Sequence, residues 1–184
     1  MDQINSVLTK NFTIAEKLSS QGNYLDAINY YNKILISYPN LAGVVNNIGL
    51  CYENLNDLDN SIRYYKRSSE LAPTETVFIN NVANIYYKKK DYLNSIKELE
   101  KSLHINKFQV EVIIRKTNCL IKLNLRKKVK FFLNEHICNF PKNVTLNILC
   151  GRNLIILNEH RVGLEFLKKG TGFIELSKDG IRII

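Results

Sequence analysis

The residue types that most often perform catalysis or bind metals are sparse in this chain. His104, His136 and His160 are its only histidines, and no two of them have the i, i+4 spacing that places two imidazoles on one helix face. His136, Cys138 and Cys150 could be drawn as metal ligands, but residues two apart on a helix point to different sides. No GxSxG, P-loop or dinucleotide-binding motif occurs. We therefore predict that the protein is not an enzyme, needs no metal or cofactor, and uses its histidines in buried or half-buried structural roles.

A cluster of cations in the second half of the chain is the next group that could do chemistry. Residues 1–75 carry six Lys and Arg against eight Asp and Glu, a net charge of −2, whereas residues 76–184 carry twenty against nine, a net charge of +11. Residues 112–134 contain no acidic residue. Such a patch can bind phosphates or an acidic partner surface, and a solvated ridge is the alternative. Its residues are Arg115, Lys116, Lys122, Arg126, Lys127, Lys128 and Lys130.

The overall composition is that of a folded protein, with 45% hydrophobic and 23% charged residues. The four cysteines are scattered and form no CxxC pair, which favours free thiols in a reducing compartment. The N-terminal residues show no secretory signal, and no apolar run reaches the roughly 18–20 residues of a membrane helix. We therefore expect a cytoplasmic protein that has no membrane-spanning segment.

The elements that position these residues follow from an internal repeat. Pro39 and Pro73 stand 34 residues apart and Pro141 follows 68 residues later, with Lys107 at the skipped position. A 34-residue period with helical patterning is typical of helix–turn–helix repeats that end in proline. Placing the proline at position 32 gives the repeats 8–41, 42–75, 76–109, 110–143 (diverged) and 144–171 (degenerate).

Four other positions of the repeat support the same frames. Positions 8 and 20 should be small because the two helices of a pair cross there, and positions 11 and 24 should be bulky. Polar breaks lie between the two helices of each of the first three pairs, at 21–24, 56–58 and 90–92. The four columns contain Ala15, Gly49, Ala83, Thr117 and Gly151 (position 8); Leu18, Tyr52, Tyr86, Leu120 and Leu154 (11); Ala27, Ser61, Ser95, Val129 and Gly163 (20); and Tyr31, Tyr65, Leu99, Leu133 and Leu167 (24).

This pattern resembles the tetratricopeptide repeat family, strongly over residues 8–106 and less so beyond. The fourth repeat departs from the family at Lys116, where an apolar residue is usual, and at His136, where a small one is usual. The resemblance implies an all-α, right-handed α-solenoid of about five helix pairs. Residues 1–7 should extend the first helix. We predict that residues 172–184 form a short β-hairpin cap around Asp179 and Gly180, with an irregular tail as the alternative.

The resemblance also implies a concave groove lined by the first helix of each pair. Asn47, Asn81, Asn84 and Asn118 fall at groove positions and look like the asparagine ladder of the tetratricopeptide part of O-GlcNAc transferase, with Arg115 beside them. A carboxamide donates and accepts at once, so a row of them can pair with an extended peptide backbone. Plain solvated polar positions are the alternative. The carboxylate clamp that holds chaperone tails is matched at only two positions, so we do not expect that ligand.

Three hypotheses for function follow. The first is a scaffold or adaptor that binds an extended peptide or a partner helix, acidic or not, in the groove around Asn47, Asn81, Asn84, Arg115 and Asn118. The second is a nucleic-acid-associated solenoid that uses the patch from residue 115 to 130, although the groove lacks the regular aromatic platform that single strands require. The third is a substrate-recruiting accessory subunit of an enzyme. The oligomeric state does not follow from the sequence.

Overall fold

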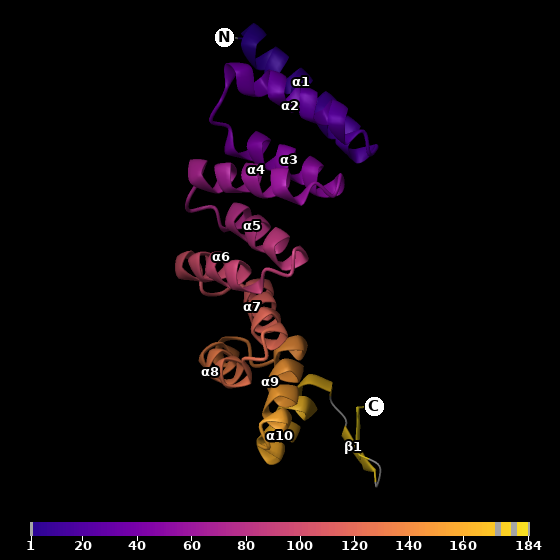
Figure 1. The fold of residues 1–184 in the computed structure, drawn as a ribbon, viewed down its shortest axis with the longest axis vertical. Helices are drawn as coiled ribbons and strands as arrows, with labels where there is room; N and C mark the ends of the chain where they lie inside the picture. The colour runs from indigo at the N-terminus through magenta and orange to yellow at the C-terminus, as the bar shows by residue number, and fades with distance from the viewer. Residues whose placement is uncertain (1, 172–173, 178–179, 184) are drawn as a thin grey trace. The chain divides into compact units, whose positions relative to one another are not determined.

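The computed structural model describes residues 2–171, 174–177 and 180–183, and the side chains of residues 7–171. The chain forms two compact units, Met1–Ile105 and Asn106–Ile184, each built of antiparallel helix pairs (Figure 1). Together the described residues contain ten α-helices, which confirms the predicted five helix pairs. None of the described helices is long and apolar enough to cross a membrane.

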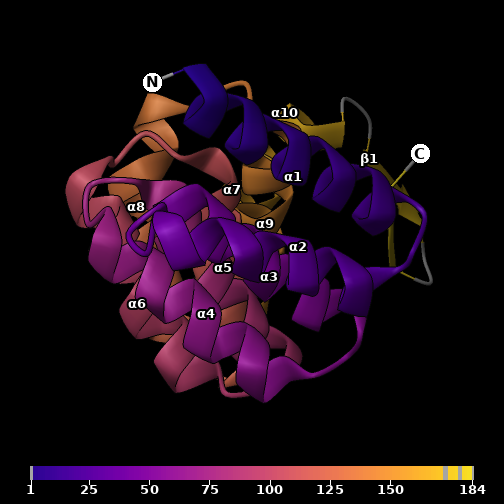
Figure 2. The same cartoon turned by 90° about the horizontal axis from the view of Figure 1, so that it is seen from above.

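The first unit consists of three pairs in which each helix contacts the next one along the chain. Figure 2 shows these pairs from above. The first helix begins at Asp2, so residues 2–7 extend it as predicted. The helices are α1 (Asp2–Ser20), α2 (Tyr24–Ser37), α3 (Ala42–Asn54), α4 (Leu58–Leu71), α5 (Thr76–Lys88) and α6 (Tyr92–Ile105).

The second unit contains two helix pairs and a hairpin. The strands β1 and β2 are antiparallel, with Ile174 opposite Ile183 and Leu176 opposite Ile181, so a C-terminal hairpin is present. Asp179, in the predicted turn, lies outside the described residues. The elements are α7 (Val110–Lys122), α8 (Arg126–His136), a 3₁₀ turn η1 (Ile137–Asn139), α9 (Val144–Ile156), α10 (His160–Thr171), β1 (Ile174–Ser177) and β2 (Gly180–Ile183).

Every turn inside a pair has the same backbone geometry. Position 15 of the repeat has a left-handed φ between 57° and 83° in all five pairs. The amide of the next residue donates to the carbonyl of position 11 at 2.9 Å in each case. This is the bond that closes a helix end of the Schellman type. The left-handed residues are Gly22, Asn56, Lys90, Asn124 and Asn158.

The small positions are where the helices of a pair come closest. Every residue at positions 8, 20 and 24 is buried. A Cβ added at Gly49 would lie 2.7 Å from Cδ1 of Tyr65, and one added at Gly151 would lie 2.7 Å from the carbonyl oxygen of Gly163. In the third pair, the Ser95 hydroxyl donates to the Ala83 carbonyl at 2.9 Å. The sequence prediction of small residues at the crossing is therefore confirmed, including in the fifth pair.

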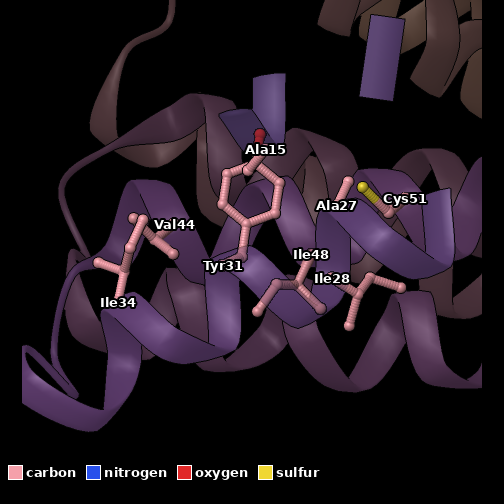
Figure 3. Close-up of a cluster of buried hydrophobic side chains, with 8 residues drawn as sticks. All are labelled: Ala15, Ala27, Ile28, Tyr31, Ile34, Val44, Ile48 and Cys51. Atoms are coloured by element: carbon pink, nitrogen blue, oxygen red, sulfur yellow. The ribbon is translucent and has the colours of Figure 1, made fainter. Parts of the chain in front are cut away.

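The core of the first pair continues into the second without a break. Tyr31 and Ile34 of α2 lie in one cluster with Val44 and Ile48 of α3, as Figure 3 shows. The first pair thus buries its apolar face on the second, as expected for repeat proteins. The cluster consists of Ala15, Ala27, Ile28, Tyr31, Ile34, Val44, Ile48 and Cys51.

The two unusual residues of the fourth repeat meet on one aromatic ring. His136 is buried, its Nδ1 lies 3.0 Å from the Phe132 carbonyl oxygen, and its ring centroid is 4.4 Å from that of Phe132. The Lys116 ammonium lies 4.4 Å from the centroid of the same ring. The structural role predicted for His136 is confirmed, whereas it is wrong for His104 and His160, which are exposed.

Candidate functional site

Two side-chain bridges connect α3 to α5 in the first unit. In the first bridge, Asn81 Nδ2 donates to Asn46 Oδ1 at 2.8 Å. This bond uses one N–H of Asn81 and one acceptor position of Asn46. The Nδ2 of Asn46 and the Oδ1 of Asn81 remain, so the pair still offers donors and an acceptor.

The second bridge lies two helical turns further along both helices. Lys88 Nζ donates to Glu53 Oε1 at 2.6 Å, and the other oxygen of Glu53 accepts from the Tyr65 hydroxyl at 2.7 Å. Burial and the neighbouring Glu53 carboxylate both raise the pKa of Tyr65, which stays a neutral donor. Both oxygens of the carboxylate are thus satisfied, and the Lys88 side chain is half exposed.

The surface between the two bridges is short and mixed in character. The bridges are seven positions apart on each helix, which corresponds to about 10 Å along the axis. Leu50 of α3 is 43% exposed there, and Asn84 of α5 is half-buried. No described residue hydrogen-bonds the Asn84 carboxamide. An apolar side chain and an uncommitted amide therefore lie between the two bridges. We name the surface formed by Asn46, Asn81, Asn84 and Leu50 the amide row.

The other predicted groove residues have different surroundings. Asn47 is half-buried and its Nδ2 lies 3.4 Å from the Tyr31 hydroxyl, so it contacts the core of the preceding pair. Arg115 and Asn118 are half-buried on α7 and belong to the second unit. The structure brings Asn81 and Asn46 together. The roles in binding stay predictions for all five selected residues, Asn47, Asn81, Asn84, Arg115 and Asn118.

The basic patch is partly engaged within the second unit. Lys130 Nζ lies 2.6 and 2.7 Å from the two carboxylate oxygens of Glu159. Arg126 is half-buried, and its carbonyl accepts from Asn153 Nδ2 at 3.1 Å. Lys122, Lys127 and Lys128 are exposed. The patch thus offers fewer uncommitted cations than the sequence indicates.

The cysteines and acidic residues form no metal-binding group in the described part of the chain. No group of three His, Cys, Asp or Glu residues there could bind a metal ion. Cys51, Cys119 and Cys150 are buried and Cys138 is exposed, and all four are free thiols. Burial raises the pKa of Cys150 to about 11, so its thiol stays protonated at neutral pH.

The helix pairs, their crossings and their turns define an α-helical-hairpin repeat protein. Residues 42–75 and 78–108 match the family model for the Tetratricopeptide repeat. The resemblance to the tetratricopeptide family that the proline spacing indicated is therefore confirmed over these two repeats.

Solved structures show the same fold. "Crystal structure of MamA protein" has a TM-score of 0.77 and 15% identity, and the match covers 91% of this chain and 92% of that chain. A MamA fragment from Desulfovibrio magneticus RS-1 has a TM-score of 0.75 and 13% identity over 90% and 94%. "YrrB: a TPR protein with an unusual peptide-binding site" has a TM-score of 0.70 and 14% identity over 88% and 84%. No curated protein matches the chain.

Sequence reasoning did not select four of the residues that form the two bridges and the interval between them. Asn46, Leu50, Glu53 and Lys88 occupy positions 5, 9, 12 and 13 of their repeats, all of which are groove positions in the family. The repeat spacing could have indicated these pairs, because Asn46 and Asn81, like Glu53 and Lys88, are 35 residues apart, one more than the repeat length. Their pairing depends on side-chain directions, which the frame alone does not give.

Proposed function

We propose that the protein is a non-catalytic interaction scaffold whose first unit binds an extended peptide on the amide row of α3 and α5. The observation that carries this proposal is the Asn81–Asn46 bond of 2.8 Å. It fixes two carboxamides in place, so their remaining donors and acceptor are preorganised for a peptide backbone. Side chains held in this way lose less entropy when a ligand binds.

The length and chemistry of the interval suit a short stretch of peptide. About 10 Å between the bridges corresponds to roughly three residues of extended chain. The backbone of such a segment can pair with the carboxamides of Asn46, Asn81 and Asn84, while an apolar side chain packs on exposed Leu50. The printed description of YrrB as a peptide-binding repeat protein is consistent with this use of the fold.

The proposal is tested with a peptide selected from a random library displayed on phage, using the full chain as bait. The double variant Asn46→Ala with Asn81→Ala should bind that peptide about fivefold to a hundredfold more weakly, because each lost hydrogen bond contributes about 0.5–1.5 kcal/mol. Asn32→Ala, an exposed asparagine on α2, is the matched control. Equal affinity of the double variant and the control, with both variants folded, would rule the amide row out.

The two other hypotheses receive less support. The ion pair of Lys130 with Glu159 withdraws one cation from a nucleic-acid surface. An accessory role beside an enzyme is compatible with the same groove, and it differs from the scaffold only in the identity of the partner.

A further inference from the structure

A groove of about 620 Å³ lies on the first unit between the C-terminal parts of α4 and α6. Apolar groups contribute to its lining: Ile79 of α5, which is buried, together with Pro73 and Ile105. Ile79 and Asn81 are two residues apart on α5 and therefore point to different sides of the helix. The groove is a surface separate from the amide row.

The preceding repeat junction shows which group occupies the equivalent place. There, Arg67 of α4 reaches back to the previous repeat, and its Nη2 donates to the Pro39 carbonyl at 2.8 Å. Pro39 corresponds to Pro73 and Arg67 to Lys101, because both pairs are 34 residues apart. At the first junction, the chain's own guanidinium thus connects the end of one repeat to the second helix of the next.

The second junction lacks this connection. Lys101 lies along its own helix, with Nζ 2.9 and 3.0 Å from the two oxygens of Glu98. No described residue donates a side-chain hydrogen bond to the Pro73 carbonyl. Three carboxylates line the groove, from Glu70, Glu98 and Glu100, against the cation of Lys101 and the imidazole of His104. Lys66 lies near two of these carboxylates, and its hydrogen bond with Tyr86, together with their charges, raises its pKa. The groove is therefore acidic, with an apolar lining and a backbone acceptor at its edge.

We propose that this groove docks a partner segment that presents an arginine beside an aliphatic side chain. A guanidinium has five N–H donors in a fixed fork, so it can donate to the Pro73 carbonyl, as Arg67 does to Pro39, and to a carboxylate such as Glu70 at the same time. The aliphatic neighbour packs on Ile79 and Ile105. A lysine supplies the charge without the fork and binds more weakly.

The test uses the isotope-labelled full chain and NMR titration with a hexapeptide in which arginine and leucine alternate. We expect amide shifts centred on Glu70, Ile79 and Lys101 of the groove, with affinity that falls as salt rises. The lysine analogue should bind several-fold more weakly and the glutamate analogue not at all. No groove shifts at about 1 mM peptide, or equal shifts with the glutamate analogue, would overturn the proposal. Amide shifts in the groove that appear in the absence of peptide as the protein concentration rises would also overturn it, since they would identify a second copy of the chain as the occupant.

One substitution gives the second junction the guanidinium that Arg67 supplies at the first. Lys101→Arg should supply the internal guanidinium, occupy the Pro73 carbonyl and weaken peptide binding about tenfold. Lys97→Arg, at an exposed site on the same helix, should leave binding unchanged. Binding of the peptide to the Lys101→Arg variant as tightly as to the Lys97→Arg control would contradict the assigned role of Pro73. The Asn46→Ala and Asn81→Ala variant should bind this hexapeptide normally, so failure of the amide row and failure of this groove are distinguishable.

Discussion

Gly49 and Gly43 are two glycines of α3 with opposite surroundings. A Cβ at position 49 would meet the Tyr65 ring at 2.7 Å, whereas one at position 43 meets nothing within 4 Å. The ring cannot yield easily, because Tyr65 is 1% exposed and its hydroxyl is bonded to Glu53.

Gly49→Ala should therefore destabilise the protein by about 1–3 kcal/mol through overpacking at the helix crossing. Gly43→Ala should stabilise it by roughly 0.5–1 kcal/mol, because alanine is the better helix former and meets no obstacle. Urea unfolding of both variants measures the two free-energy changes. A loss for Gly43→Ala as large as that for Gly49→Ala would show that the crossing is not the cause.

The candidate site shows what is predictable at the level of single residues. The frame selected Asn81 and Asn47 as groove residues. In the structure Asn81 bonds Asn46, which the frame did not select, while the carboxamide of Asn47 contacts Tyr31. Asn46 and Asn47 differ by one position, about 100° around the helix. Repeat positions indicate which turn of a helix carries such amides, and the choice between adjacent amides depends on side-chain packing that is specified only in the folded molecule.

At the level of elements, the left-handed turn residue is the feature common to all five pairs. Glycine and asparagine occupy it in four pairs, and Lys90 occupies it in the third with φ 60°. A left-handed conformation costs a residue with a long side chain roughly 1–2 kcal/mol, while asparagine tolerates it better and glycine adopts it freely.

Lys90→Gly should raise the free energy of unfolding by about 0.5–1 kcal/mol, since the relieved strain exceeds the extra entropy of glycine in the unfolded chain. Asn56→Gly, at the same place in the second pair, should give a smaller gain. Thermal unfolding followed by circular dichroism compares the two. A larger gain at Asn56 than at Lys90 would contradict the strain argument.

Two helix N-termini are capped by aspartates with the same geometry. Asp91 accepts from the Asn94 amide at 3.2 Å and from its Nδ2 at 2.7 Å, and Asp57 accepts from Asn60 in the same way. These hydrogen bonds lower the pKa of both carboxyl groups. A lowered pKa in the folded state gives stability that is present above the unfolded pKa and is lost as the pH falls through the folded value.

Asp91→Asn should consequently destabilise the protein at neutral pH, and the difference from the wild type should shrink as the pH falls below about 4. Asp57→Asn should behave alike, because its contacts are the same. Chemical unfolding of the two variants across this pH range provides the measurement. A difference that stays constant with pH would mean that the carboxylate charge contributes nothing to capping.

The helix pairs were predictable because several independent signals coincide in each repeat. Proline spacing, small residues at crossings and polar breaks all follow the same period, so their joint pattern leaves little freedom for the fold. The division of the array into two units was not predicted. It falls after Ile105, next to Lys107, which occupies the position where the other complete repeats have proline. A missing proline is a weak signal, because lysine is compatible with many loop conformations.

The charge of the whole molecule suggests nucleic acid as a partner, and contacts within the second unit engage part of the basic patch. The engagement of Lys130 with Glu159 and of Lys116 with the Phe132 ring leaves fewer cations for phosphates. We expect that the full chain does not bind a single-stranded RNA oligonucleotide tightly at physiological salt, about 0.15 M, as measured by fluorescence anisotropy. Tight binding that weakens steeply as salt rises would contradict this expectation and favour the basic patch.

The central claim is that the first unit binds the backbone of an extended peptide through the amide row. The most direct measurement compares, by calorimetry, the phage-selected peptide with copies that carry a single N-methyl group on one backbone amide. Methylation removes one N–H donor and leaves every side chain in place. The account predicts that methylation at one or two neighbouring amides lowers affinity at least about tenfold, while alanine substitution of most side chains has little effect. Full affinity for every N-methylated copy would contradict it.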